Sequence, residues 1–240
     1  MTAFIHGNIE YVMPTVFKAT MRDWTRDLID DGTIYFTNIQ QFIDDPDCER
    51  GDANEGRHIG IRKGVRCTAD YSMPVYVWCC TLDTRACRVI QTWQDKNCVI
   101  QILDTFEFAK RITSALGQQQ PKLWPLHVGP IVYTKTAGGY ENTDWADGVF
   151  QKDERYDGQK EFRFALTGQT GQQPEDHIVL NLGSCRDIVR IALIMNPEQC
   201  TLRRRPVGRA LEPTLAPAKQ GMDNHRISIY SSNGRLICQH

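Results

Sequence analysis

The sequence predicts an α+β fold in which strands outnumber helices. Segments rich in β-branched and aromatic residues recur along most of the chain, whereas amphipathic helical patterns occur only in its first half. With 240 residues, of which 41% are hydrophobic and 24% charged, the chain is long enough to bury a sizeable core. We therefore expect two mainly antiparallel or mixed sheets that form a cleft, two helices in the first half and a small C-terminal β-hairpin.

The first predicted unit is a strand, a helix and a second strand. The segment TVFKAT (15–20) favours a strand, and Thr20 with Asp23 forms a capping-box-like start for the helix that follows. Gly32 is placed to end this helix in a left-handed conformation. The alternating segment TIYFTN (33–38) then predicts the second strand.

The middle of the chain adds strands and the second helix. PVYVWCCTL (74–82) is almost continuously apolar, which is typical of a strand covered on both faces. CVIQIL (98–103) predicts another strand, after which Asp104 and Glu107 begin a helix that Gly117 closes. Further strands are expected at residues 129–135, 160–166, 177–182 and 188–195.

The C-terminal part differs in composition from the rest of the chain. Residues 202–224 contain four arginines and three prolines without a regular period, whereas Asn233-Gly234 lies between two short alternating segments, a strong hairpin signal. We therefore divide the chain into an α+β domain (1–200), an Arg/Pro-rich linker or arm (201–225) and a C-terminal hairpin that packs on the main domain (226–240).

The charge balance excludes a protein that binds nucleic acid or membrane through its overall field. The sequence has 28 basic and 29 acidic residues, a net charge of -1, so such a contact must be local. Arginine clusters attract phosphate, and a solvated linker is the alternative interpretation of the same residues. We expect a possible anionic partner to contact Arg203, Arg204 and Arg205.

Cysteine usage and hydropathy indicate the cellular compartment. The nine cysteines are odd in number and form no Cys-x-x-Cys motif. No apolar run approaches the ~20 residues that span a bilayer, and the N-terminal segment lacks the pattern of a signal peptide. We therefore expect free thiols in a cytoplasmic protein that makes no membrane contact.

Several polar side chains share one face of their predicted strands. In the segment 160–166, the two-residue period separates Phe162 and Phe164, which we expect in the core, from the polar residues. Similar polar faces occur in the segments 15–20 and 33–38. Such faces suit either a solvated surface or the wall of a cleft, and the alternative to a catalytic Glu161 is a carboxylate that is solvated or paired with an arginine. The polar-face residues are Lys18, Tyr35, Thr37, Gln159, Glu161 and Arg163.

The order of several motifs resembles a widespread bacterial and phage-associated family of unknown function. The matching segments are FTNIQQFIDDPDCERGD (36–52), VYVWCCTL (75–82), VGPIVYTK (128–135) and FQKDERYDGQKEFRFAL (150–166). In addition, Gln159-Lys160-Glu161 resembles the Gln-x-Glu signature of some ADP-ribosyltransferases.

The second resemblance implies an NAD-consuming enzyme or effector, toxin-like or related to defence, with NAD in a cleft between two small sheets. It implies that Lys18 contacts the dinucleotide and that Tyr35 and Thr37 support the nicotinamide side. Glu161 would stabilise the ribose oxocarbenium, and Gln159 would orient an acceptor, which is a protein or a nucleic acid. Lys18 stands where Arg or His is usual, and it holds a phosphate only as a point charge. Replacing Glu161 with glutamine is expected to lower activity by at least ~10²–10³-fold with little loss of stability.

Two other functions are compatible with the same residues. The polar strand faces also suit a non-catalytic module that binds protein or nucleic acid. The acidic loop 44–55 carries the oxygen ligands that a metal-dependent nuclease needs. Its spacing does not match a calcium-binding loop, however, and a solvated crossing between strands explains it more simply. We therefore assign no metal ligands.

Overall fold

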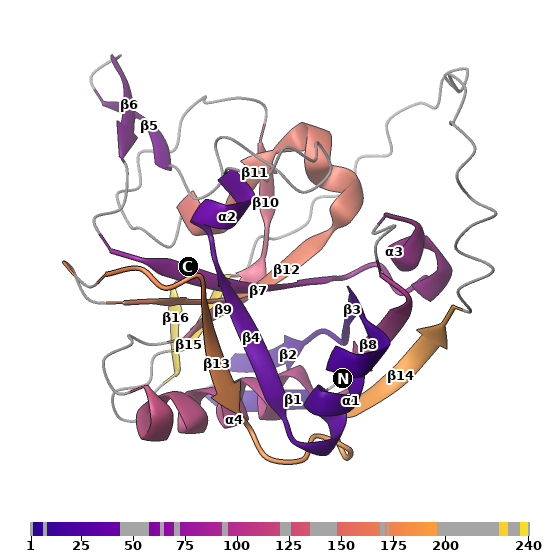
Figure 1. Ribbon diagram of the computed structural model, residues 1–240. Helices are drawn as coiled ribbons and strands as arrows, with labels where there is room; N and C mark the ends of the chain where they lie inside the picture. The colour runs from indigo at the N-terminus through magenta and orange to yellow at the C-terminus, as the bar shows by residue number, and fades with distance from the viewer. Residues whose placement is uncertain are drawn as a thin grey trace, which may run out of the picture.

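The protein is described by a computed structural model that covers residues 2–6, 9–43, 58–62, 65–69, 73–92, 96–120, 126–134, 148–168, 171, 173–195, 226–229 and 236–239. These residues form an α+β fold, as predicted, and Figure 1 shows their arrangement. The acidic loop 44–55, the arm 201–225 and the arginines Arg203, Arg204 and Arg205 lie outside the described residues.

The main sheet, as far as the chain is described, contains ten strands. Eight of them follow one hydrogen-bonded path in the order β14 (Val189–Ile194), β8 (Cys98–Ile102), β3 (Val16–Thr20), β7 (Val75–Thr81), β12 (Glu161–Thr167), β9 (His127–Pro130), β15 (Arg226–Ile229) and β16 (Leu236–Gln239). The other two, β4 (Thr33–Asn38) and β13 (His177–Asn181), pair with each other, and β4 also pairs with β7.

The main sheet forks at one edge of β7. Near the end of β7, Thr81 pairs with Phe17 of β3, whereas nearer its start Val77 pairs with Thr37 of β4. The other edge of β7 pairs along its length with β12. Helix α1 (Arg22–Asp30) connects β3 to β4 across the fork (Figure 1). In place of the two sheets predicted from the sequence, the described residues thus form one main sheet with two arms that meet at β7.

Smaller elements complete the described part of the fold. The two-stranded sheets are β1 (Thr2–His6) with β2 (Ile9–Met13), β5 (His58–Arg62) with β6 (Val65–Ala69), and β10 (Val132–Thr134) with β11 (Gln151–Asp153), of which the last is parallel. The remaining helices are α2 (Gln40–Ile43), α3 (Ala86–Thr92), α4 (Thr105–Gln119) and the 3₁₀ helix η1 (Glu154–Gln159). Across the described residues, no helix has the length and apolar character needed to cross a membrane.

Most predicted strand ends shift by a residue, as β12 does from 160–166 to Glu161–Thr167, and three further differences have a clear local cause. The strand expected at 129–135 is broken into β9 and β10 after Pro130, which has no N–H to donate to a ladder. Gly117 lies inside α4, which continues to Gln119. Thr20 does not cap α1: it is the last residue of β3, and Met21 is the N-cap without a side-chain hydrogen bond.

The main hydrophobic core lies between the sheet and α4. The rings of Trp78, Phe108 and Phe164 pack against one another with centroids 5.2 to 5.5 Å apart. Phe162 belongs to the same cluster, whereas Ala165 belongs to a second cluster. The two faces of β12 thus contact different apolar layers, and the predicted core positions Phe162 and Phe164 are confirmed.

The start of α4 provides a test of capping. The Asp104 side chain accepts a hydrogen bond of 2.9 Å from the backbone N–H of Glu107. Asp104→Ala should therefore lower the free energy of unfolding by about 1 kcal/mol, measured by urea denaturation. Ser114→Ala on the exposed side of the same helix is the control and should change stability much less. Equal losses in the two variants would contradict the capping role.

Candidate functional site

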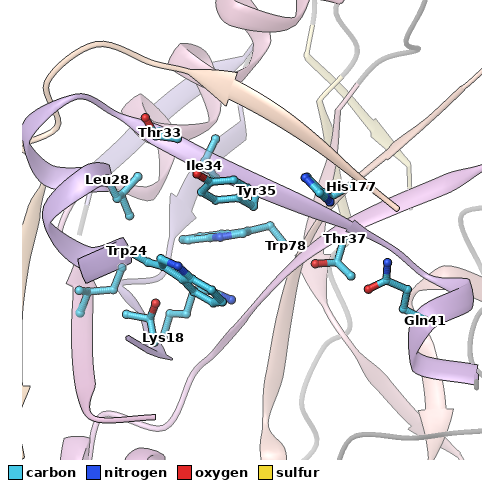
Figure 2. A pocket seen from close by; sticks show the side chains of 12 residues that line it. Lys18, Trp24, Leu28, Thr33, Ile34, Tyr35, Thr37, Gln41, Trp78 and His177 are labelled. Atoms are coloured by element: carbon cyan, nitrogen blue, oxygen red, sulfur yellow. The ribbon is translucent and has the colours of Figure 1, made fainter. Parts of the chain in front are cut away.

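A cleft opens where β3 and β4 diverge from β7. Two adjoining cavities, of about 390 Å³ and 370 Å³, share lining residues from α1, β3, β4 and β7. We call them together the fork cleft, and Figure 2 shows the side chains around the first cavity. The shared lining residues are Lys18, Thr20, Trp24, Tyr35, Thr37, Gln41 and Trp78.

The fork cleft brings together all five residues singled out as candidate site residues. Lys18 comes from β3, Tyr35 and Thr37 from β4, Gln159 from the end of η1 and Glu161 from the start of β12. These segments are far apart in sequence. They meet because β7 pairs with β3 and β4 on one edge and with β12 on the other.

Lys18 lies at the junction of β3 and β7. Its Nζ donates a 2.7 Å hydrogen bond to the carbonyl oxygen of Cys79 and lies 4.8 Å from the centroid of the Trp78 ring. An ammonium has three protons, so Lys18 can donate further hydrogen bonds. The cleft therefore contains a positive charge next to the Trp78 ring.

Glu161 is buried, not solvated. Its exposed fraction is 6%, and that of Arg163 is 2%. Arg163 donates from Nε to Oε1 of Glu161 at 2.5 Å and from Nη2 to Oε2 at 3.1 Å. Lys152 Nζ donates to the same Oε2 at 3.1 Å. The solvated interpretation of this polar face is therefore wrong, and we define Lys152, Glu161 and Arg163 as the buried triad.

The charge state of Glu161 follows from two opposing effects. Burial by itself would raise the pKa of the carboxyl group. The positive charges of Arg163 and Lys152, together with the hydrogen bond from Arg163, lower this pKa by more than burial raises it. The net pKa lies well below the usual range for glutamate. The carboxylate is therefore ionised at neutral pH.

Gln159 reaches the cleft by a different route from the predicted one. It is the last residue of η1 and does not lie on the strand with Glu161, because Lys160 between them adopts a left-handed conformation with φ of 45°. Thr81 of β7 fixes this junction by donating a 2.6 Å hydrogen bond to the Gln159 carbonyl oxygen. The Gln159 side chain still lines the cleft and accepts a hydrogen bond from Lys152.

Besides the predicted Tyr35, the cleft contains ring side chains that were not among the predicted site residues, namely those of Trp24, Trp78 and His177. Trp24 is 53% exposed and Tyr35 is 40% exposed, and their ring centroids are 6.3 Å apart (Figure 2). The His177 ring lies 6.0 Å from that of Tyr35, and Lys96 Nζ lies 5.4 Å from that of Trp24. Helical spacing groups Trp24 with the buried Leu28, so the sequence pattern assigns Trp24 to the core.

The cysteines near the cleft are not activated nucleophiles. Burial raises the pKa of Cys79 and raises that of Cys80 to about 12, so both thiols stay protonated at neutral pH. Cys80 packs in the main core and Cys79 against the second cluster, as expected for neighbours on a strand. In the part of the chain that the structure describes, no three His, Cys, Asp or Glu residues are grouped to hold a metal ion.

No protein family model, curated protein or solved structure matches this chain.

Proposed function

We propose that the fork cleft binds NAD and that the protein is an ADP-ribosyltransferase-like, NAD-consuming enzyme. The observation that carries this proposal is the convergence of five residues from distant segments on one cleft at the fork of the sheet. Their chemistry is complementary: Lys18 provides a positive charge, Tyr35 a ring, Thr37 a hydroxyl, Gln159 an amide and Glu161 a carboxylate.

The cleft has the features that a dinucleotide requires. A flat base or nicotinamide ring can stack on Trp24 or Tyr35, which are exposed at the cleft. A diphosphate can accept hydrogen bonds from Lys18, and Lys96 adds a second positive charge among the lining residues. These contacts use the neutral ring and the negative phosphates of the same ligand.

Glu161 is suited to stabilise the transition state. When the N-glycosidic bond breaks, nicotinamide leaves with the bonding electron pair and the ribose acquires oxocarbenium character, which the nucleophile of an acceptor then quenches. A fixed carboxylate that accepts a hydrogen bond from a ribose hydroxyl stabilises this positive charge, and it does so most effectively where water is excluded. Gln159 lies beside Glu161 in the lining and is placed to orient the acceptor, a protein or a nucleic acid.

The direct test is release of nicotinamide. Purified protein is incubated with NAD, alone and with protein or nucleic-acid acceptors, and nicotinamide is quantified by chromatography. Release that depends on the protein and transfer of ADP-ribose to an acceptor support the proposal. An absence of release with every acceptor, under conditions in which the protein is folded, contradicts catalysis.

Lys18 gives a prediction for binding. Lys18→Met keeps most of the apolar stem and removes the charge, so the affinity for NAD should fall about 10- to 100-fold, as expected for the loss of one hydrogen bond to a charged group. The dissociation constant can be measured by calorimetry. Lys110→Met, on the exposed side of α4 where Lys110 pairs with Glu107, is the control and should bind like the parent. Equal affinity of the Lys18 variant and the parent would exclude the phosphate contact.

A second function is favoured by the hydrogen bonds that the Glu161 carboxylate already accepts within the protein. This carboxylate accepts three hydrogen bonds from Arg163 and Lys152, of about four that a carboxylate can accept. The buried triad carries two positive charges and one negative charge, so it presents no excess negative charge to a developing cation. This arrangement favours a non-catalytic binding module that recognises an anionic ligand. Tight binding of NAD or another nucleotide without nicotinamide release would identify it.

A further inference from the structure

We infer that Lys152 is a positioning residue of the fork cleft, which orients the Glu161 carboxylate and the Gln159 amide together. Lys152 was not among the residues that the sequence singled out. It lies on β11, in a polar stretch between the predicted strands, and its side chain is 5% exposed. The inference deepens the proposed function and depends on it only for the chemistry assigned to Glu161 and Gln159.

The geometry connects one ammonium group to both side chains. Lys152 Nζ lies 3.1 Å from Oε2 of Glu161 and 3.1 Å from Oε1 of Gln159. The Tyr156 ring, with its centroid 5.0 Å away, packs against the same ammonium group. The Gln159 oxygen therefore accepts from the ammonium group that also donates to Glu161, which fixes the two side chains relative to each other.

Arg163 does not perform this role. Its planar guanidinium holds Glu161 through Nε and Nη2, and its Nη1 donates to the Val149 carbonyl oxygen at 2.7 Å. Arg163 therefore connects the carboxylate to the backbone at Val149, just before β11, whereas Lys152 connects the carboxylate to the side-chain amide of Gln159 at the end of η1. Arg163 and Lys152 therefore have different structural roles at the Glu161 carboxylate.

Removing Lys152 should leave a protein that folds. The buried triad has one positive charge in excess, so Lys152→Met leaves Glu161 and Arg163 as a balanced, doubly hydrogen-bonded pair. Replacing a buried charged group by an apolar one of similar volume is tolerated where the remaining charges stay paired. The effect of this variant on the cleft can therefore be measured in the folded state.

The experiment compares Lys152→Met and Lys152→Arg with the parent. With ¹³C-carboxyl-labelled glutamate, NMR titration reports the ionisation of Glu161 without any activity assay. In Lys152→Met the Glu161 carboxylate should titrate about one pH unit or more higher than in the parent, because one of its two cations is gone. Lys152→Arg keeps the charge and should restore most of the shift.

Kinetics provide the second measurement where the parent consumes NAD. Lys152→Met should lower kcat by about tenfold or more, as for the loss of one positioned group, with little change in KM, since Lys18 and the rings hold the ligand. The acidic limb of the pH profile of kcat should move to higher pH, because Glu161 acts as the ionised form. Arg155→Met is the control: Arg155 contacts Tyr156 but is exposed, and it should leave both measurements unchanged.

The outcomes separate the inference from the proposed function. A folded Lys152→Met protein with the parent's Glu161 titration overturns the inference. A Lys152→Met protein that fails to fold also overturns it, because Lys152 would then be a structural residue. A parent that releases no nicotinamide contradicts the proposed function alone, and the NMR titration still decides whether Lys152 positions Glu161.

Discussion

Glu161→Gln is expected to destabilise the protein by about 3–5 kcal/mol, the cost of removing one partner from a buried ion pair. The glutamine side chain keeps the size of Glu161, but it leaves Lys152 and Arg163, which are 5% and 2% exposed, without their common anion. The sequence pattern alone predicts little loss of stability for this substitution. The structure removes the basis of that prediction, because the polar face of β12 is buried.

Urea denaturation of two variants tests this prediction. A triple variant with methionine in place of Lys152, Glu161 and Arg163 removes all three charges, so it should be much more stable than Glu161→Gln. A Glu161→Gln protein that loses less than about 1 kcal/mol, the scale of an exposed ion pair, would contradict the buried triad.

A test of catalysis by Glu161 must use a variant that keeps the negative charge of the side chain. Glu161→Asp does so, and turnover of NAD should fall about 100-fold from the misplaced carboxylate.

The same carboxylate makes stability depend on pH in the acidic range. The pKa of Glu161 in the folded protein is below the unfolded value of about 4.3, because Arg163 and Lys152 outweigh the opposing effect of burial. A group with a lowered folded-state pKa stabilises the protein fully above its unfolded pKa, and this contribution is lost as the pH falls toward the folded-state pKa. The contribution of the buried triad should therefore be constant near neutral pH, should begin to fall below about pH 4, and should be lost progressively as the pH approaches the folded-state pKa of Glu161.

Local sequence patterns predicted the elements better than they predicted how the elements meet. β4 begins and ends where the alternation of TIYFTN indicates, because Gly32 separates it from α1. The fork at β7 was not predicted, since no local pattern shows that one strand edge pairs with two different strands. Pro130 carried a usable signal for the break between β9 and β10, because proline cannot donate to a ladder.

The residue types of the candidate site were predictable, but their environments were not. Alternation placed Glu161 and Arg163 on one face, yet the second cation of the triad comes from Lys152 in a different strand. Trp24 has the helical spacing of a core residue but is exposed at the cleft. The burial of a side chain and its hydrogen-bond partners depend on how distant segments pack together. The local periodicity of a sequence does not show this packing.

Gly32→Ala is expected to cost about 2–5 kcal/mol, the sum of a left-handed alanine and of overpacking. Gly32 has φ of +73°, and a Cβ atom there would lie 2.0 Å from the carbonyl oxygen of Gly183. The backbone around Gly183 cannot yield easily, because Leu182 N–H donates to the Gly32 carbonyl oxygen at 3.0 Å and Cys185 N–H donates to that of Ile29 at 2.9 Å. The turn at Gly32 therefore sets the direction in which the chain passes from α1 into β4.

Substitutions at two other glycines separate the two contributions to the stability loss of Gly32→Ala, the left-handed backbone and the close contact with Gly183. Gly183 has φ of +70° with open space at its Cβ position, so Gly183→Ala should show only the conformational cost of about 1–2 kcal/mol. Gly117 lies inside α4 with no atom near its Cβ position, and Gly117→Ala should stabilise the protein by about 0.5–1 kcal/mol. Thermal and urea denaturation give all three values. Because β4 carries Tyr35 and Thr37, Gly32→Ala should also weaken ligand binding in the fork cleft, whereas Gly117→Ala should not. Equal costs at Gly32 and Gly183 would show that the close approach to Gly183 does not constrain the turn at Gly32.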